Sequence, residues 1–457
     1  MNALGGQVLE GLNDYQKARI VNQLTFANPA YTKAVEMGQP TQGISETILG
    51  YKEHHGKLIV PKHFKQVPLS NVVPSESSSR AFEKTLKSRP RAEQENVIAA
   101  LSGSMADIGL SLPCGFGKTF LALFYASRFE GRVLVVCPTN VKLAEWRAEI
   151  TKHMHITSAE IGQVQASKRD YLDYPITVTM LKTLATQSFP EEFLGGFDLI
   201  IWDEAHLCGA PVLSRALGRV KGVNLTLTAT PGSGVRRKLI ELHNGSNWIT
   251  ESNVRHVPVS AYFVPVPVSG YIKSLDWRFQ KIRLAKTNSY TQVAAKHIAH
   301  AISKNRRVLV LNSQISPLVY LKKQFNRGGF VVGSGSLKDV AKADVLKVNP
   351  DKKSWKESVT SYLDYVKEVC NPILATGLTK TQPGGVGMDV SNLDAGVIMF
   401  PVSCPDMTQQ MLGRWQRYHP NKKNPIIVIM VPQTDIALAI AKKMASKLRS
   451  LGVTVQI

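Results

Sequence analysis

The segment Gly115-Phe116-Gly117-Lys118-Thr119 has the residue types and the order that bind phosphate groups. Glycines let backbone N–H groups close around a phosphate, and a helix N-terminus adds positive potential. Lys118 would reach the β- and γ-phosphates of ATP, and the Thr119 hydroxyl would bind Mg²⁺. The strict pattern has glycine at position 112, where this chain has Leu112. The segment predicts an ATP site with one departure, and an ordinary surface turn is the alternative.

A pair of carboxylates, Asp203 and Glu204, follows the apolar run Leu199–Trp202. A carboxylate at the carboxyl end of a strand beside a phosphate loop is placed to hold Mg²⁺. The neighbouring Glu204 is then placed to orient and deprotonate an attacking water. The alternative is a helix N-terminus with two acidic residues, which is common. We expect the catalytic interpretation, because the carboxylates follow a strand downstream of Lys118.

Elements that could position these residues occur in two series of nearly continuous apolar runs. Such runs, separated by stretches of helical pattern, are typical of parallel sheets covered on both faces. The first series is 108–112, 133–136, 176–179, 199–202 and 225–228, and the second, which begins near Ser260, includes 307–311, 372–375, 397–400 and 426–430. The sequence predicts an α/β chain with a small mixed domain over 1–84 and tandem parallel-sheet domains over 85–255 and 256–457.

The charge balance indicates a polyanionic partner. The 457 residues include 56 Lys and Arg against 34 Asp and Glu, a net charge of +22. From Tyr271 to Ile457 there are 28 basic and 11 acidic residues. Nucleic acid is the natural partner for such a surface, and a solvated basic face is the alternative. We expect a cytoplasmic protein, in the host cell if viral, because no apolar run spans a bilayer and the five cysteines form no CxxC pair.

The order of motifs from residue 89 to 417 resembles that of superfamily 2 helicases, and Asp203-Glu204-Ala205-His206 matches the DEAH form of their hydrolysis motif. This resemblance implies two tandem RecA-like domains, ATP and Mg²⁺ as cofactors, and DNA as partner. The roles that it implies are adenine contact for Gln94, nucleotide binding for Gly387 and Asp389, DNA binding for Pro138, Thr139, Thr183 and Thr376, and coupling of hydrolysis to strand movement for His206, Thr228 and Thr230.

The last of these motifs is Gln410-Met411-Leu412-Gly413-Arg414-Trp415-Gln416-Arg417. Residues three or four apart share a helical face, so Gln410, Arg414 and Arg417 are expected to point one way. The resemblance makes the two arginines fingers that neutralise charge on the γ-phosphoryl group. A basic amphipathic helix is the alternative. We expect Trp415 to be a packing residue, and stacking on a base is the alternative for it.

Three functions fit these motifs: an ATP-driven DNA motor, an RNA helicase, and a binding protein with an inactive ATPase fold. The tighter signature of RNA-unwinding Asp-Glu-Ala-Asp proteins is absent upstream of the phosphate loop, and the retained Lys118, Glu204 and Arg414 argue against an inactive fold. A motor of a restriction or defence system is a further alternative, although no convincing nuclease motif is present. The compact chain resembles phage recombination helicases and, in function, RecG, which implies unwinding of forks and movement of Holliday junctions.

The segment before residue 85 carries four lysines, Lys52, Lys57, Lys62 and Lys65, around a short strand signal. We expect this segment to contact duplex or branched DNA through phosphates. The alternative is a brace that only stabilises the first α/β unit. We expect no membrane association and no obligate protein partner.

Overall fold

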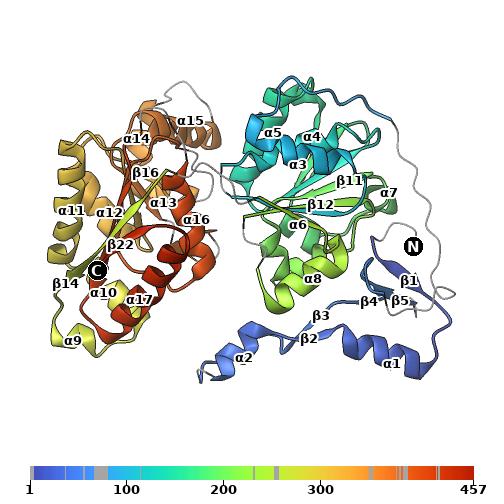
Figure 1. The fold of residues 1–457 in the computed structure, drawn as a ribbon, viewed down its shortest axis with the longest axis horizontal. Helices are drawn as coiled ribbons and strands as arrows, with labels where there is room; N and C mark the ends of the chain where they lie inside the picture. Colours follow the sequence, from blue (N-terminus) through green and yellow to red (C-terminus); the bar gives the residue numbers. More distant parts are fainter. Residues whose placement is uncertain are drawn as a thin grey trace. The chain divides into compact units, whose positions relative to one another are not determined.

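The chain forms two compact α/β units, residues 1–254 and 255–457, in a computed structural model (Figure 1). The structure describes residues 5–36, 38–54, 57–65, 81–113, 115–210, 212–229, 232–251, 257–348, 354–376, 378–379, 382–383, 390–417, 419 and 422–457. Each unit is built on its own sheet and has its own apolar core.

The sheet of the first unit has the order β13-β6-β12-β11-β7-β10-β8-β9. All neighbours are parallel except β9, which is antiparallel to β8. The strands are β6 (Ile108–Ser111), β7 (Val133–Cys137), β8 (Ile161–Gln165), β9 (Lys168–Asp170), β10 (Ile176–Met180), β11 (Leu199–Trp202), β12 (Val223–Thr228) and β13 (Trp248–Thr250). The five expected strands are therefore confirmed, and the carboxyl ends of β6, β12, β11 and β7 lie at one edge.

Helices cover both faces of this sheet, as continuous apolar strands require. One face packs against α3 (Glu95–Ser102), α4 (Lys118–Ala126) and α5 (Asn140–His153). The other packs against α6 (Leu181–Thr186), α7 (Glu191–Leu194) and α8 (Gly234–Asn244) (Figure 1). The helix α4 buries six of its nine residues, so the turn before it is held firmly against the sheet.

The second unit has a seven-stranded parallel sheet of order β16-β17-β15-β20-β21-β14-β22. The strands are β14 (Ser260–Val266), β15 (Val308–Asn312), β16 (Gly329–Val331), β17 (Ile373–Thr376), β20 (Ala395–Ile398), β21 (Ile426–Pro432) and β22 (Thr454–Gln456); β18 (Leu378–Thr379) and β19 (Gln382–Pro383) form a separate hairpin. The helices are α9 (Gly270–Lys273), α10 (Trp277–Ala285), α11 (Asn288–Ser303), α12 (Ile315–Gln324), α13 (Ser334–Val340), α14 (Lys342–Val348), α15 (Trp355–Glu368), α16 (Pro405–Gln416) and α17 (Asp435–Ser450). The expectation of two tandem parallel-sheet units is confirmed.

Two further expectations concern exposure to membranes and thiol chemistry. Within the described part of the chain, no helix has the length and apolar character needed to cross a bilayer. Cys137, Cys208 and Cys370 are buried free thiols, and Cys404 is partly buried. Cys114 lies outside the described residues. These four thiols therefore act as small packing groups.

The N-terminal segment folds onto the first unit. Its elements are β1 (Gln7–Leu9), α1 (Asp14–Gln23), β2 (Thr25–Ala27), α2 (Pro29–Glu36), β3 (Thr47–Leu49), β4 (Lys52–His54) and β5 (Lys57–Val60). The strands form a β1-β5-β4 sheet and a β2-β3 hairpin, both antiparallel. Leu9, Leu24, Leu58 and Val60 are almost fully buried in one core with Trp202 of the α/β sheet. This segment therefore completes the core on one face of that sheet.

Three of the four lysines around β4 and β5 are used inside the first unit. Lys52 donates to the carbonyls of Arg215 and Leu217 at 3.2 and 3.4 Å, and burial beside Arg219 lowers the pKa of Lys52 to about 8. Lys57 pairs with Glu10. These contacts support the bracing alternative, and DNA contact by this segment stays a prediction.

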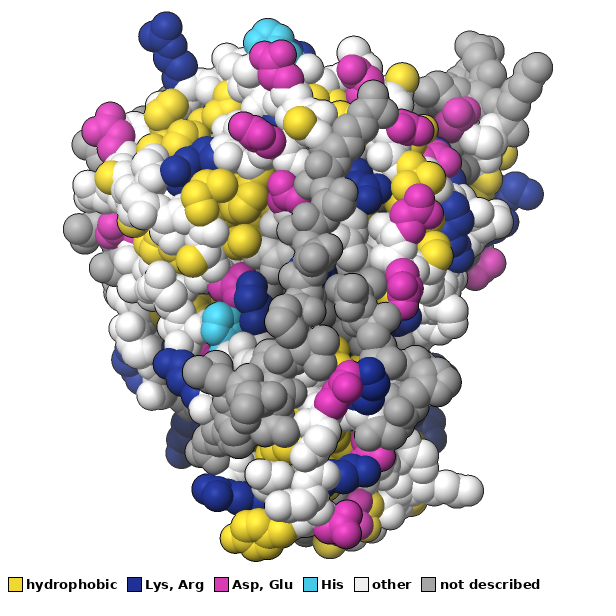
Figure 2. Space-filling model, turned by 90° about the vertical axis from the view of Figure 1, so that its right-hand side faces the viewer, with side chains coloured by type: hydrophobic (Ala, Val, Ile, Leu, Met, Phe, Trp, Pro, Cys, Tyr) yellow, Lys and Arg dark blue, Asp and Glu magenta, His cyan; other side chains and the backbone are white. Residues whose placement is uncertain are grey.

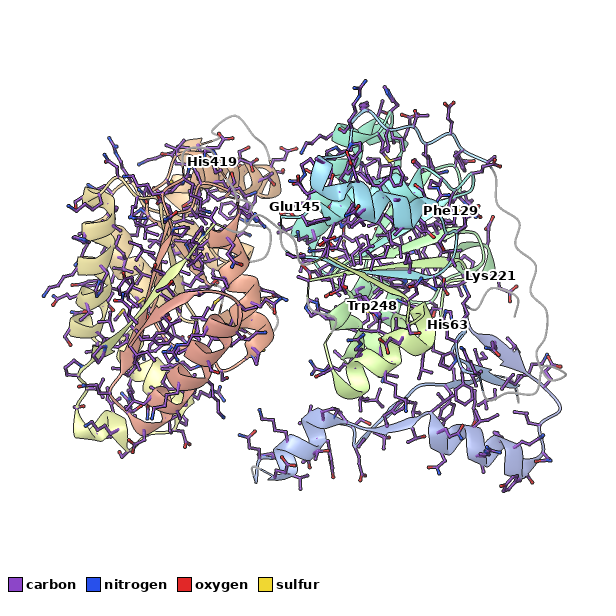
Figure 3. The ribbon with its side chains drawn as sticks, viewed as in Figure 1. His63, Phe129, Glu145, Lys221, Trp248 and His419 are labelled. Atoms are coloured by element: carbon purple, nitrogen blue, oxygen red, sulfur yellow. The ribbon has the colours of Figure 1, made fainter. Side chains whose placement is uncertain are left out.

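The third lysine belongs to an anchor around Asp107, whose side chain is 4% exposed. Asp107 Oδ2 lies 3.0 Å from Lys62 Nζ and 2.5 Å from His63 Nε2, and Oδ1 accepts from the Asn224 backbone N–H at 2.7 Å. His63 lies at the boundary between the N-terminal strands and the α/β sheet (Figure 3). Burial alone would raise the pKa of Asp107, but His63, Lys62 and the Asn224 N–H together hold it below its ordinary value.

We predict that Asp107→Asn lowers the free energy of unfolding by about 1.5 kcal/mol at neutral pH, because it removes the charge of a buried carboxylate that accepts from the partly exposed Lys62. A carboxylate with a depressed pKa stabilises the fold above its unfolded pKa, about 4, and loses this effect as the pH falls. The deficit should therefore shrink below pH 4 in urea titrations across pH. Asp170→Asn, which loses an exposed ion pair with Lys168, is the control. Equal stability losses for both variants would contradict the anchor.

Candidate active site

The predicted phosphate loop connects β6 to α4. Gly115 and Gly117 have φ values of 85° and 90°, a region that side chains other than glycine disfavour, and Gly117 is the cap before α4. Lys118 is the first residue of α4, and its Nζ donates to the carbonyls of Leu112 and Pro113 at 2.8 and 3.1 Å. The backbone around Gly115 and Gly117 therefore has the curvature of an anion-binding turn, with the lysine folded over it.

Leu112, which occupies the position where the strict motif has glycine, packs into the core of the first unit. Leu112 is fully buried, and its backbone N–H donates to the Thr228 carbonyl at 3.1 Å. Its own carbonyl accepts from Lys118. A leucine at this position therefore extends the strand β6 and packs its side chain, while its backbone still serves the loop.

Arg91 and Gln94 hold the loop from outside. Gln94 is 2% exposed, and its Nε2 donates to the Phe116 carbonyl at 2.8 Å. Arg91 donates to the carbonyls of Phe116 and Gly115 at 2.6 and 3.1 Å. A Cβ atom on Gly117 would lie 2.3 Å from Gln94 Nε2, so only glycine fits this approach. The adenine contact of Gln94 stays a prediction; sequence reasoning missed Arg91.

The acidic pair lies just beyond β11, two strands from β6. Asp203 Oδ2 accepts from the indole N–H of Trp146 at 2.9 Å, and the Asp203 backbone N–H donates to the Val136 carbonyl. Desolvation raises the pKa of Asp203, and the Glu204 charge adds to this, while Lys142 opposes it. Desolvation would lower the pKa of Lys142, but Asp203 and Glu145 outweigh it and raise that pKa. Glu145, the partner of Lys142, lies on α5 and is labelled in Figure 3.

Glu204 has an unusual backbone and an unsatisfied oxygen. Its φ is 50°, one of three left-handed positions outside glycine in the described chain. Its Oε2 is buried without a hydrogen bond, although His206 Nδ1 lies 3.4 Å away. His206 Nδ1 is also 3.2 Å from Thr228 Oγ1 at the end of β12. Backbone strain of this kind is concentrated at functional sites, and His206 connects Glu204 to the predicted coupling motif.

The donor set at this edge fits Mg²⁺. Magnesium in nucleotide sites is held by one or two protein oxygens together with waters and substrate phosphates. The Asp203 carboxylate and the Thr119 hydroxyl in the first turn of α4 are such oxygens, and the Lys118 charge acts on Asp203. No group of three or more His, Cys, Asp or Glu residues suited to a metal occurs among the residues that are described. The site therefore suits a magnesium ion that arrives with a nucleotide.

The residues predicted to bind DNA in the first unit differ in exposure. Pro138 and Thr139 lie directly after β7 and are partly exposed, and the Thr139 hydroxyl caps α5 by accepting from the Lys142 N–H at 3.3 Å. Thr183 in α6 is 5% exposed. Its neighbour Lys182 is exposed and was missed from sequence. Thr139 is therefore better placed than Thr183 for a side-chain contact.

The predicted residues of the second unit lie on two elements. Thr376 ends β17, and Gln410 and Arg414 share a face of α16. Arg417 directly follows α16 as its C-terminal cap residue, with φ of −60° and ψ of 133°, so the chain leaves the helix after it; the shared face with Gln410 and Arg414 stays a prediction. Lys422 holds this turn by donating to the Arg417 carbonyl at 2.9 Å. Thr230, Gly387 and Asp389 lie outside the described residues.

Trp415 is a packing residue, as expected from the sequence. It is fully buried, and its indole N–H donates to the Ala395 carbonyl at 2.9 Å. A Cβ atom on Gly396 would lie 2.4 Å from its ring. The ring therefore fixes α16 against β20.

These features resemble a nucleotide-hydrolysis site of the phosphate-loop type, and the chain is similar to known proteins of related description. A family model described as the res subunit of type III restriction enzymes matches residues 87–233. The chain is 23% identical over 351 residues to the probable helicase D10 of Escherichia phage T5, covering 74% of this chain and 70% of that protein. It is 29% identical over 125 residues to the DNA 3'-5' helicase XPB of Kineococcus radiotolerans, which covers 26% of this chain and 22% of that protein.

Among solved structures, the helicase domain of Pyrococcus furiosus Hef matches 77% of this chain and 97% of its own, with 14% identity and a TM-score of 0.46. The sequence matches, taken with the site, support a helicase of superfamily 2 that uses ATP. The family model covers the phosphate loop, the acidic pair and Thr228.

We predict that Lys118→Ala lowers the ATPase kcat by at least about 100-fold, because it removes the charge that faces the transferred phosphoryl group. The measurement is steady-state phosphate release at saturating ATP. Lys152→Ala, an exposed position on α5, should keep the parent rate. DNA affinity, measured by filter binding without nucleotide, should change little in both variants. A Lys118→Ala protein with a near-normal rate would refute the assignment of the phosphate loop.

Proposed function

We propose that this protein is an ATP-dependent DNA helicase or translocase that unwinds or branch-migrates forks and Holliday junctions. The observation that carries the ATPase part is the convergence of Lys118, Asp203 and Glu204 at one sheet edge, with His206 connecting Glu204 to Thr228. The motor part is supported by the relatives, two of which are named as helicases.

In this proposal each side chain has a separate task. Lys118 binds the β- and γ-phosphates, while Thr119 and Asp203 hold Mg²⁺, which neutralises charge on the phosphates when bound. Glu204 orients and deprotonates the attacking water, consistent with its buried, unsatisfied Oε2. His206 then transmits the state of Glu204 to Thr228. The resemblance to superfamily 2 helicases gives Arg414 and Arg417 the task of neutralising transition-state charge.

DNA as the track is supported by charge and by exposure. Exposed cations gather in the second unit along α9 and α10, where residues 270–286 hold five basic residues and one acidic residue. Lys273, Arg278 and Arg283 are exposed there, beside Tyr271 and Phe279, which are 61% and 54% exposed. On the side shown in Figure 2, by contrast, basic and acidic side chains are interspersed. Basic surfaces with exposed aromatic rings suit single strands, whose bases stack on the rings.

A second candidate is the motor of a restriction or defence system, which is favoured by the family model over residues 87–233. An RNA helicase is the third. Two measurements distinguish these functions. The first is ATPase activity in the presence of DNA and of RNA, and the second is unwinding of a fork, a Holliday junction and a linear duplex. The proposal expects ATPase stimulation by DNA above RNA and unwinding of branched substrates above linear ones. Stimulation by RNA alone, or ATP-driven movement without any branch preference, would contradict it.

We predict that Glu204→Gln binds ATP normally but lowers kcat by about 100-fold or more, because the amide keeps the shape and loses the base. Binding is measured with a fluorescent ATP analogue and turnover by phosphate release. Glu149→Gln on α5, a partly exposed carboxylate paired with Lys152, is the control and should keep the parent rate. Undiminished turnover in Glu204→Gln would assign the base to another residue.

A further inference from the structure

We infer that Trp146 is a positioning residue for the magnesium site, because its indole N–H fixes the Asp203 carboxylate. This inference rests on the proposed function, since it assigns Asp203 to Mg²⁺. The bond joins Trp146 Nε1 and Asp203 Oδ2 at 2.9 Å, and indole has only this one donor. This bond fixes the orientation of the carboxylate, which keeps further lone pairs for other ligands.

Trp146 is held firmly enough for this task. It is 2% exposed and belongs to the buried face of α5 with Leu143 and Ile150, which are 5% and 0% exposed. The helix is fixed at its beginning by the Thr139 cap and by the ion pair of Lys142 with Glu145 at 2.8 Å. A ring packed in this way presents its N–H at one place. Outer partners of metal-binding carboxylates orient them, and losing such a partner commonly weakens metal binding 10- to 100-fold.

The alternative is that Trp146 only fills space in the core, and the chain itself offers a control for this. Trp202 is also buried, 1% exposed, and its indole N–H donates to Asn224 Oδ1 at 2.9 Å. It belongs to β11, directly before Asp203, but its bond leads away from the carboxylate. Trp146→Phe and Trp202→Phe therefore remove the same ring portion and one hydrogen bond each, and only the first bond reaches the metal site.

The experiment measures how much Mg²⁺ each full-length variant needs to bind a fluorescent ATP analogue, in parallel with thermal unfolding. Trp146→Phe is expected to raise the Mg²⁺ concentration at half-saturation about tenfold. Trp202→Phe should leave this midpoint unchanged although it also loses thermal stability. Equal midpoints in Trp146→Phe and the parent protein, or equal shifts in both variants, would overturn the inference.

A third variant separates the hydrogen bond from the packing. In Trp146→His the Nε2–H occupies the ring position of the indole N–H, whereas the outer six-membered ring is lost. This protein should unfold at a lower temperature than Trp146→Phe and yet need nearly the parent concentration of Mg²⁺. A midpoint raised as far as in Trp146→Phe would show that shape, not the bond, matters. The parent protein and the three variants are compared at a temperature below the lowest of their unfolding midpoints, so that loss of folded protein is not mistaken for weaker Mg²⁺ binding.

The same measurements also test the proposed magnesium site separately from the role of Trp146. If the parent protein binds the nucleotide equally with and without Mg²⁺, the assignment of Asp203 and Thr119 to the metal is wrong. If the parent protein needs Mg²⁺ and Trp146→Phe needs no more, the metal site stands and only the role of Trp146 falls.

Discussion

The parallel register of four neighbouring strands is the constraint on which the site depends. The strand β11 pairs with both β7 and β12, so Trp202 lies opposite Val136 and Thr226, and β12 pairs with β6, so Thr228 lies opposite Ser111. Parallel strands end at the same edge, and each is followed there by a loop. A shift of β11 by one residue would turn Asp203 to the other face and break its contact with Trp146. The chemistry therefore depends on the register.

This register needs a core on both faces of the sheet, and the N-terminal segment supplies part of one. Its apolar side chains share a cluster with Leu134, Ile200 and Trp202 from the strands that carry the site. The ion pair of Lys62 and the hydrogen bond of His63 with Asp107 attach the segment beside the first residue of β6. These polar contacts and the shared core both lie within the first unit. The segment therefore stabilises the sheet whether or not its outer surface binds a nucleic acid.

Much of the fold and of the site could be predicted from sequence, for a physical reason. Central strands such as β7 and β11 are buried on both faces and are therefore continuous apolar runs, and the phosphate loop needs glycines at fixed positions. Edge strands were missed, because β9 consists of Lys168, Arg169 and Asp170 and has no apolar pattern. The end of α16 was not predicted either, although Pro420, three residues beyond Arg417, is a residue type that marks the end of a helix.

Supporting residues were the hardest to predict, because their role depends on partners distant in the chain. The resemblance groups Trp146 with Pro138 and Thr139 in a DNA-contacting motif, but Trp146 lies with Leu143 and Ile150 on the buried face of α5. The remaining signal is chemical: a buried indole N–H requires an acceptor, and the acceptor here is 57 residues away. The same helix begins at Thr139, a predicted DNA contact, so one rigid element carries both that position and the partner of Asp203. The motif groups Thr139 with Trp146 along the sequence, and only the fold shows that the buried face of α5 contacts Asp203.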